Sequence, residues 1–240
     1  MRRDSEPLQQ RAMHELIKTA EKIENSVLGL TVLIGVFTGI RANTLCHIHS
    51  DWFKHDEGNL YLRVPNEFRC RKYGKDELCG DCRARVGDGY SPKSDASGGR
   101  RLKIPETWHN HYTGQDEAPT EIRKRIEHYF AIGDDDYGNS MLDGDGISVS
   151  TANRYVKLVA KEAEIGFYLK QGYIDHSKLG RVPDLMVHDL RATYCVQLMR
   201  NNANPFKAIN KTGHADVDSL EIYIEFAEGE FDGDFEESFI

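Results

Sequence analysis

His188-Asp-Leu-Arg191, Gly213-His214 and Tyr223 lie in the stretch from Val187 to Tyr223, which decides how the fold of this chain is interpreted. Arginine and histidine side chains neutralise phosphate charge and transfer protons, whereas a tyrosine phenol can serve as a covalent nucleophile. An enzyme that attacks a phosphodiester without a metal ion uses all of these groups, and no ordinary core pattern needs them together. The stretch therefore predicts phosphoryl-transfer chemistry.

Length and composition predict a folded, water-soluble protein. The chain has 240 residues, of which 39% are hydrophobic and 29% charged, enough for one large domain with a real core. The most apolar run, Val27 to Phe37, is too short to span a membrane and indicates a buried helix. The polar N-terminus leads into no apolar signal region, so we expect a cytoplasmic protein without a membrane partner.

The net charge of −8 neither favours nor excludes nucleic-acid binding. The segment from Glu225 to Ile240 holds seven acidic residues and no basic one, and the rest of the chain is nearly neutral. Local basic clusters remain that could contact phosphates, namely residues 69–72, 83–85, 100–103 and 123–125. The excess of surface acid is also typical of proteins from high-salt cells. Composition is therefore neutral on a DNA partner.

Hydrophobic periodicity predicts an α+β fold that is mainly helical, with a small sheet near the centre. Three segments have the pattern of strands: residues 59–64, 90–93 and 102–104. The predicted helices cover residues 8–25, 27–37, 42–50, 120–132, 150–165, 189–200, 204–210 and 216–226. No internal repeat is visible, so we expect one domain.

Taken singly, each candidate site residue has an ordinary structural explanation. Arg41 follows a buried helix, and an arginine there is either a structural ion pair or a phosphate ligand. His188 and Arg191 are one helical turn apart, which is also common for a surface or cap contact. His214 follows a glycine that ends a helix, and Tyr223 could be a core tyrosine on an amphipathic helix. Their order along the chain is more informative than any one of them.

The ordered set resembles the catalytic domain of the tyrosine recombinases, also called phage-type integrases. The resemblance extends from Leu8 to Phe226, so a catalytic domain over residues 1–226 is expected, with a mainly helical fold and a small antiparallel sheet. The matching strings are Thr38-Gly-Ile-Arg41, His188-Asp-Leu-Arg-Ala-Thr-Tyr194, Thr212-Gly-His214 and Tyr223. Each string is weak alone, and the set in this order is specific.

That family also places a lysine on a β-hairpin between its first arginine and its histidine–arginine helix. The segment Ser91 to Pro105 resembles this hairpin and has Lys93 at the functional position, with Lys103 as the competing lysine. The shape of the hairpin is similar to that of integrases from halophilic archaea or their viruses. By this resemblance Lys93 belongs to the catalytic set.

The resemblance implies a covalent mechanism. Tyr223 would attack the scissile phosphate and form a 3′-phosphotyrosyl link, while Lys93 would protonate the leaving 5′-oxygen. His188 would help to accept the tyrosine proton. The 5′-hydroxyl of a second strand would then reverse the step, so catalysis needs no cofactor.

The remaining members of the set would handle the phosphate. Arg41 and Arg191 would hold the non-bridging oxygens as negative charge builds, and His214 would hydrogen-bond the phosphate. The implied partner is double-stranded DNA bound by a homo-tetramer, which makes a nucleoid-associated recombinase or integrase the expected function. Two alternatives stay open, namely a non-catalytic or remnant DNA-binding protein of the same fold and a DNA-relaxing enzyme like the type IB topoisomerases.

The two ends of the chain are expected to differ from the usual family plan. So few residues precede the catalytic fold that the helical core-binding domain of the family is expected to be absent. Residues 227–240 form an acidic C-terminal tail, either a solubilising end or a segment that docks through its phenylalanines on a neighbouring subunit.

A cysteine cluster lies in an insertion over residues 66–90. Cys70, Cys79 and Cys82 have the spacing of one zinc knuckle plus a further thiolate, which favours a structural zinc ion. The insertion has little apolar content to fold around, which also favours a metal. Reduced thiols are the alternative interpretation. Candidates for the fourth ligand are Cys46, His47, His49, His55 and Asp81.

Overall fold

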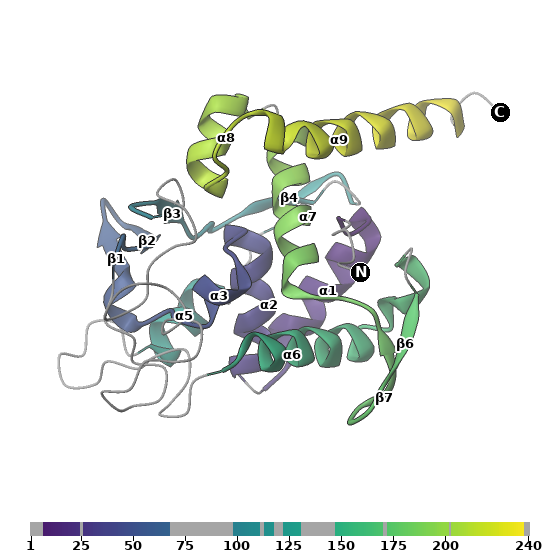
Figure 1. Cartoon of the computed structure of the whole chain (residues 1–240), viewed down its shortest axis with the longest axis horizontal. Coiled ribbons are helices and arrows are strands. Elements are labelled where there is room, and N and C mark those ends of the chain that lie inside the picture. The colour runs from purple at the N-terminus through teal and green to yellow at the C-terminus, as the bar shows by residue number, and fades with distance from the viewer. Residues whose placement is uncertain are drawn as a thin grey trace.

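The chain folds as a mainly helical α+β protein in the computed structural model of Figure 1, which confirms the predicted fold class. The structure describes residues 7–24, 26–67, 98–110, 113–117, 122–130, 147–169, 172–201 and 203–237. The longer helices are α1 (Gln10–Lys22), α2 (Ser26–Thr38), α6 (Val149–Glu162), α7 (Val187–Arg200) and α9 (Asp218–Glu237). The shorter ones are α3 (Ala42–Leu45), α5 (Ile122–Tyr129) and α8 (Pro205–Thr212), with 3₁₀ helices η1 (Ser50–Trp52) and η3 (Ile165–Tyr168).

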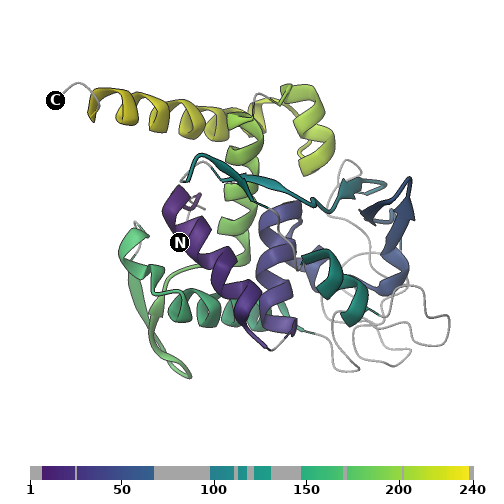
Figure 2. The same cartoon turned by 180° about the vertical axis from the view of Figure 1, so that it is seen from behind.

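Helix α2 forms the centre of the fold. Its sequence is apolar on every side, as is typical of a helix that other elements cover all round. Helices α1, α5, α6 and α7 pack against it (Figures 1 and 2). Helix α1 is amphipathic instead and turns one face, including Leu16 and Ile17, into the core. Most of the buried hydrophobic residues of these helices belong to one hydrophobic cluster.

Small antiparallel sheets flank the helices, and the described residues form three of them. The largest contains β1 (Phe53–Asp56), β2 (Asn59–Arg63) and β3 (Arg101–Lys103) in that order. The others are the hairpins β4 (Trp108–Asn110) with β5 (Gln115–Glu117) and β6 (Tyr173–His176) with β7 (Gly180–Pro183). Leu62 of β2 lies opposite Leu102 of β3, and both face the core while their chain neighbours are more exposed. This alternation is the signal by which the sequence predicted both strands.

One predicted helix differs from the observed structure, and one predicted strand could not be compared with it. The helix expected over residues 42–50 was wrong in length, since α3 ends at Leu45 and η1 follows after an extended residue, His49. The His49 imidazole accepts a hydrogen bond from the Asp51 backbone N–H, a local contact that competes with a continuing helix. The predicted strand over residues 90–93 lies outside the described part of the chain.

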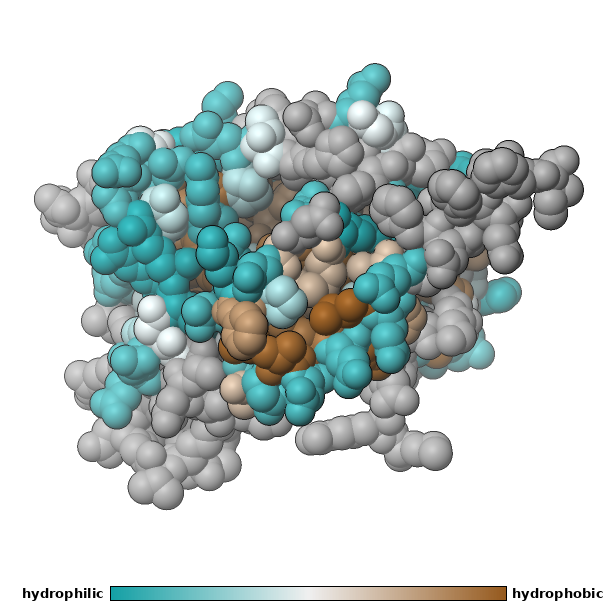
Figure 3. Space-filling view, turned by 90° about the horizontal axis from the view of Figure 1, so that it is seen from above, coloured by the Kyte–Doolittle hydropathy of each residue, from teal (hydrophilic) through white to brown (hydrophobic). Residues whose placement is uncertain are grey.

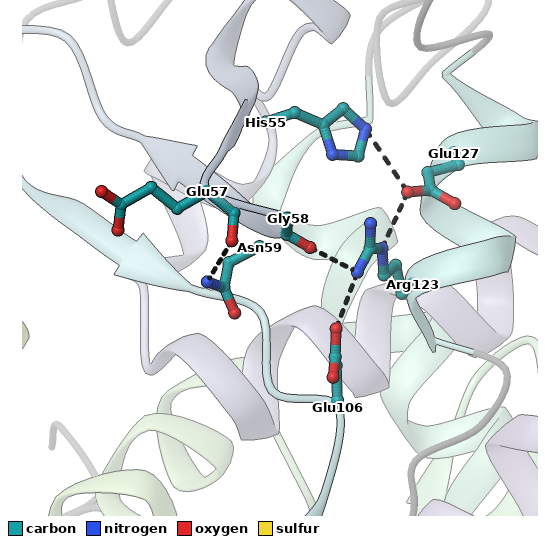
Figure 4. Close-up of polar contacts among 7 residues, drawn as sticks. All are labelled: His55, Glu57, Gly58, Asn59, Glu106, Arg123 and Glu127. Carbon is teal, nitrogen blue, oxygen red and sulfur yellow. Dashed lines mark hydrogen bonds and ion pairs between the residues drawn. The ribbon is translucent and has the colours of Figure 1, made fainter.

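Helix α5 is attached to the three-stranded sheet by Arg123 (Figure 4). The Arg123 guanidinium donates to the Gly58 carbonyl oxygen at 2.9 Å, to Glu106 at 2.7 Å and to Glu127 at 2.9 Å. Its pKa is raised, chiefly by the hydrogen bond that it donates to Glu127. His55 of β1 approaches the same Glu127 carboxylate at 3.4 Å. The network therefore fixes the edge of the sheet on α5.

Helix α9 packs on α7 and continues beyond the expected end at Phe226 to Glu237. The C-terminal part of α9 extends away from the body of the molecule in both views (Figures 1 and 2). Most of the segment predicted as an acidic tail is therefore helical in its backbone.

The described surface is mostly hydrophilic when it is viewed from above, with a smaller apolar area near the middle (Figure 3). Among the described helices none has the length and apolarity that crossing a membrane requires.

Candidate active site

Arg41 reaches the site from the turn between α2 and α3. Helix α2 ends at Thr38, and Gly39 adopts a positive φ of 59° that favours glycine. Space also requires glycine, because an added Cβ would lie 2.2 Å from Cδ1 of Tyr194. The turn brings the Arg41 guanidinium to the Gly213 carbonyl oxygen, at 3.0 Å from Nη2.

Arg191 is among the largest fully buried side chains that the structure describes. It lies on α7, where only 1% of it is exposed. Its Nη1 donates to the Gly39 carbonyl oxygen at 2.6 Å and to the Thr212 carbonyl oxygen at 2.8 Å. Burial lowers its pKa, while Cys195 and Tyr223 raise it. Arg191 thus ties the α2–α3 turn to the end of α8.

The start of α7 is fixed by its own cap. The Met186 N–H donates to the Asp189 carboxylate at 2.8 Å, and the Val187 N–H donates to Asn153 of α6 at 3.0 Å. Two orphan donors of the first turn are satisfied in this way. The cap therefore fixes the start of α7, the helix that carries Arg191.

His214 directly follows the glycine that ends α8. Its Nε2 lies 3.1 Å from Nη2 of Arg191, and its Nδ1 lies 2.7 Å from the Thr212 hydroxyl. Since a guanidinium can only donate, Nε2 accepts and the imidazole proton sits on Nδ1. Burial lowers the pKa of His214 to about 3, together with the charges of Arg191, Arg41 and Arg100, against the opposing effect of Asp216. The imidazole is therefore neutral at neutral pH.

Tyr223 lies in the second turn of α9. Its ring centroid is 5.8 Å from that of His214, with the two planes tilted by 37°. Burial raises the pKa of its phenol and Cys195 adds to this, whereas Arg191 and Arg41 lower it. The phenol is therefore protonated at neutral pH, and a nucleophilic role needs an acceptor for its proton.

A third arginine lies at the same helix end, and the sequence interpretation placed it only in a basic cluster. Arg100 is 5% exposed, and its Nη1 donates to the Lys211 carbonyl oxygen at 2.8 Å. Three successive carbonyls, of residues 211, 212 and 213, thus accept from Arg100, Arg191 and Arg41 in turn. The last carbonyls of a helix have no partner inside the helix and carry its partial negative charge. The alternation that buries Leu102 and Ile104 could have placed Arg100 on the inner face.

The structure brings Arg41, Arg191, His214 and Tyr223 together, although they come from four different segments. His188 shares the first turns of α7 with Arg191 but is exposed to solvent. Lys93 lies outside the described residues.

The proposed zinc ligands Cys70, Cys79 and Cys82 also lie outside the described residues. Within the part of the chain that the structure describes, no group of three histidine, cysteine or acidic side chains is arranged to hold a metal ion. Of the candidate fourth ligands, Cys46 is buried, and Nδ1 of His47 forms a hydrogen bond with the Asn43 carbonyl oxygen at 2.6 Å.

The fold is that of tyrosine recombinase catalytic domains, as comparison with solved structures shows. The XerA recombinase matches with a TM-score of 0.57 and 16% identity, over 94% of this chain and 62% of that one. The XerH site-specific recombinase bound to palindromic difH substrate matches with a TM-score of 0.56 and 14% identity, over 96% of this chain and 52% of that one. The Tn1549 transposon integrase in complex with transposon right end DNA matches with a TM-score of 0.56 and 15% identity, over 95% of this chain and 66% of that one.

This chain therefore spans between half and two thirds of the length of the recombinase chains that it matches. At these identities the likeness concerns the fold. No protein-family model matches the chain, and no curated protein matches its sequence.

Proposed function

We propose that this chain is the catalytic domain of a site-specific DNA recombinase or integrase that cleaves and rejoins DNA through a 3′-phosphotyrosyl intermediate. One observation carries the proposal. Arg41, Arg191, His214 and Tyr223 lie far apart in the sequence, yet they meet at the end of α8 in a fold shared with recombinases. A merely structural use would not require two arginines, a neutral imidazole and a half-buried phenol at one place.

The proposed step is an exchange of one phosphate ester for another. The Tyr223 phenolic oxygen attacks the phosphorus, a bond to the tyrosine forms and the bond to the 5′-oxygen breaks. The phenolic proton passes to a base, for which His188 is the predicted acceptor, and Lys93 is the predicted donor of a proton to the 5′-oxygen. Attack by a 5′-hydroxyl on the phosphotyrosine reverses the step, so no energy source is consumed.

Arg41 and Arg191 would neutralise the phosphate. Their guanidinium groups end at adjacent carbonyls, of residues 213 and 212, so both point into the same region. Guanidinium groups suit the non-bridging oxygens because they remain charged and can bind in a bidentate manner. His214 would donate a further hydrogen bond to the phosphate. Its Nε2 now accepts from Arg191, so this contact would have to change when the phosphate binds.

Double-stranded DNA is the proposed partner, and a homo-tetramer on DNA is the proposed assembly. The XerH structures are described as bound to difH substrate, and a lambda integrase structure as a dimer bound to a core site. The buried arginines supply local positive charge despite the acidic net charge of the chain. The high-salt origin suggested by the composition stays a prediction.

Covalent trapping tests the proposal. Wild-type protein is incubated with nicked duplexes of randomised sequence that carry 5′-bridging phosphorothiolates, which prevent religation. We expect a protein–DNA adduct that Tyr223→Phe does not form. DNA binding without an adduct would indicate the non-catalytic alternative, and relaxation of supercoiled DNA without recombination would indicate the topoisomerase-like one.

A structural zinc ion bound by Cys70, Cys79 and Cys82 is a separate proposal. Metal analysis of the purified protein should find about one zinc per chain. Cys82→Ser should lower this content, whereas Cys195→Ser, a buried thiol of α7, should leave it unchanged. An equal zinc content in the two variants would contradict the site.

A further inference from the structure

Arg100 is fixed at both its backbone and its side chain. Its carbonyl oxygen accepts from the Val64 N–H at 2.8 Å, next to the pairing of β2 and β3. Its guanidinium crosses to the last turn of α8 and donates to the Lys211 carbonyl oxygen at 2.8 Å. The turn that contains His214 is therefore bonded directly to the three-stranded sheet.

An arginine is a costly choice for this bond. Removing a guanidinium from water is unfavourable, and water can satisfy an exposed carbonyl at a helix end without that cost. The next residue, Arg101, shows the ordinary alternative. It faces solvent, where it pairs with Asp56 and lies over the ring of Tyr61. Burial of Arg100 therefore indicates that the protein needs either the bond that its guanidinium makes at this position or its positive charge.

The positive charge of Arg100 affects the pKa of His214 in the candidate site. Burial lowers the pKa of His214 most, followed by Arg191, Arg41 and Arg100, and Asp216 opposes them. These charged groups come from α7, the α2–α3 turn, the residue before β3 and the segment before α9. Arg100 also opposes the rise in the pKa of Cys195, beside Arg191 on α7.

We propose that Arg100 is a positioning residue of the cleavage site. By binding the Lys211 carbonyl it holds the turn from Lys211 to His214 against the sheet, and so sets where His214 meets the phosphate. The inference rests on the proposed function, and it adds a residue that need not touch the DNA. Arg41 and Arg191 hold the next two carbonyls, so the three arginines order the turn together.

The test compares Arg100→Met with Arg100→Lys and with Arg63→Met as the matched surface control, since Arg63 is exposed on β2 of the same sheet. Methionine keeps much of the apolar stem and loses the charge and the donors, whereas lysine keeps the charge and can still donate. Three quantities are measured for each variant: the single-turnover cleavage rate at saturating DNA, the DNA affinity, and the hydrogen exchange of amides 211–214. Thermal unfolding is recorded first, so that only folded variants are compared.

We expect Arg100→Met to cleave roughly 10- to 100-fold more slowly at saturating DNA, since small misplacements at a site have effects of this size. Its DNA affinity should change little. Arg100→Lys should recover part of the rate, and Arg63→Met should match the wild type. If Arg100→Met does not fold, the cleavage rate of Arg100→Lys decides, and a rate equal to that of the wild type overturns the inference.

A wild-type cleavage rate in Arg100→Met at saturating DNA would overturn the inference. The inference would also be overturned if Arg100→Met lost DNA affinity but kept the wild-type cleavage rate at saturating DNA. If the wild type itself forms no adduct, the proposed function fails, and hydrogen exchange then decides separately whether Arg100 holds the turn. Exchange of amides 211–214 should be roughly tenfold faster in Arg100→Met than in Arg63→Met, and equal exchange would contradict the positioning role.

Discussion

Nη2 of Arg191 lies 3.1 Å from Nε2 of His214, and this contact makes the imidazole an acceptor toward the arginine. The proton of His214 then belongs to Nδ1, which faces the Thr212 hydroxyl. Burial and the neighbouring positive charges keep the ring neutral. Bound phosphate would bring negative charge to the same place, favour a proton on the ring and compete for the donors of Arg191.

The first prediction concerns acid stability. Because the pKa of His214 is about 3 in the folded protein and near 6.5 when unfolded, the unfolded chain binds more protons between these values. His214 therefore makes the protein less stable as the pH falls below about 6.5, by at most about 1.4 kcal/mol per pH unit. Chemical denaturation of wild type and His214→Gln from pH 7 to pH 5 measures this. The variant should lose less stability, and parallel curves would contradict the assigned environment.

The second prediction concerns Gly39. Gly39→Ala should cost several kcal/mol, roughly 3 to 5, because a Cβ would meet the Tyr194 ring at 2.2 Å in addition to the strain of a positive φ. Gly58 is the matched control, since it also has a positive φ but has nothing within 4 Å of an added Cβ. Gly58→Ala should cost only about 1 kcal/mol. Similar unfolding free energies for the two variants would show that the contact with Tyr194 is unimportant.

The third prediction concerns the hydroxyl of Thr212. Thr212→Val keeps the shape but removes the partner of His214 Nδ1 and the bond to the Ala208 carbonyl. A buried donor without a partner costs roughly 1 to 3 kcal/mol, and the imidazole should lose its fixed orientation. Thr31→Val is the control, because Thr31 is also buried and bonds the carbonyl four residues earlier. Calorimetry should find Thr212→Val the less stable of the two.

The fourth prediction concerns the ion pair that joins α6 to the segment before α7. Lys157 and Asp184 lie 2.7 Å apart, with side chains 8% and 17% exposed. Lys157→Met should cost roughly 1 to 3 kcal/mol because it removes the charge partner of a carboxylate that is only 17% exposed. The double variant Lys157→Met with Asp184→Leu should recover most of that loss. Breaking the exposed pair of Arg101 and Asp56 should cost at most about 1 kcal/mol; a double variant as unstable as the single one would refute the desolvation argument.

Patterns that depend on one element were predictable from the sequence. The apolar stretch of α2 and the alternation of β2 both follow from burial of a single helix or strand. The hairpin of β6 and β7 was missed because its first strand is only partly buried and lacks a clear alternation. Most of the helix ends were predicted to within a few residues, and α9 was the largest exception.

Members of the candidate site could be named from the sequence, but their geometry could not be predicted. Helical spacing placed His188 and Arg191 on one face, yet one is exposed and the other buried. Arg191 is buried against the carbonyl oxygens of Gly39 and Thr212, which lie on other segments. The contacts of the three arginines with the end of α8 could not be predicted either, because their partners are backbone oxygens that only tertiary packing brings near.

The most direct test of the proposed chemistry is to identify the residue that becomes linked to DNA. Wild-type protein is trapped on nicked phosphorothiolate duplexes, the adduct is digested with protease and nuclease, and the modified peptide is sequenced by mass spectrometry. The proposed mechanism predicts one modified residue, Tyr223, carrying a 3′-phosphonucleotide, and no adduct with Tyr223→Phe. An adduct on another residue, or an equal yield from Tyr223→Phe, would contradict it.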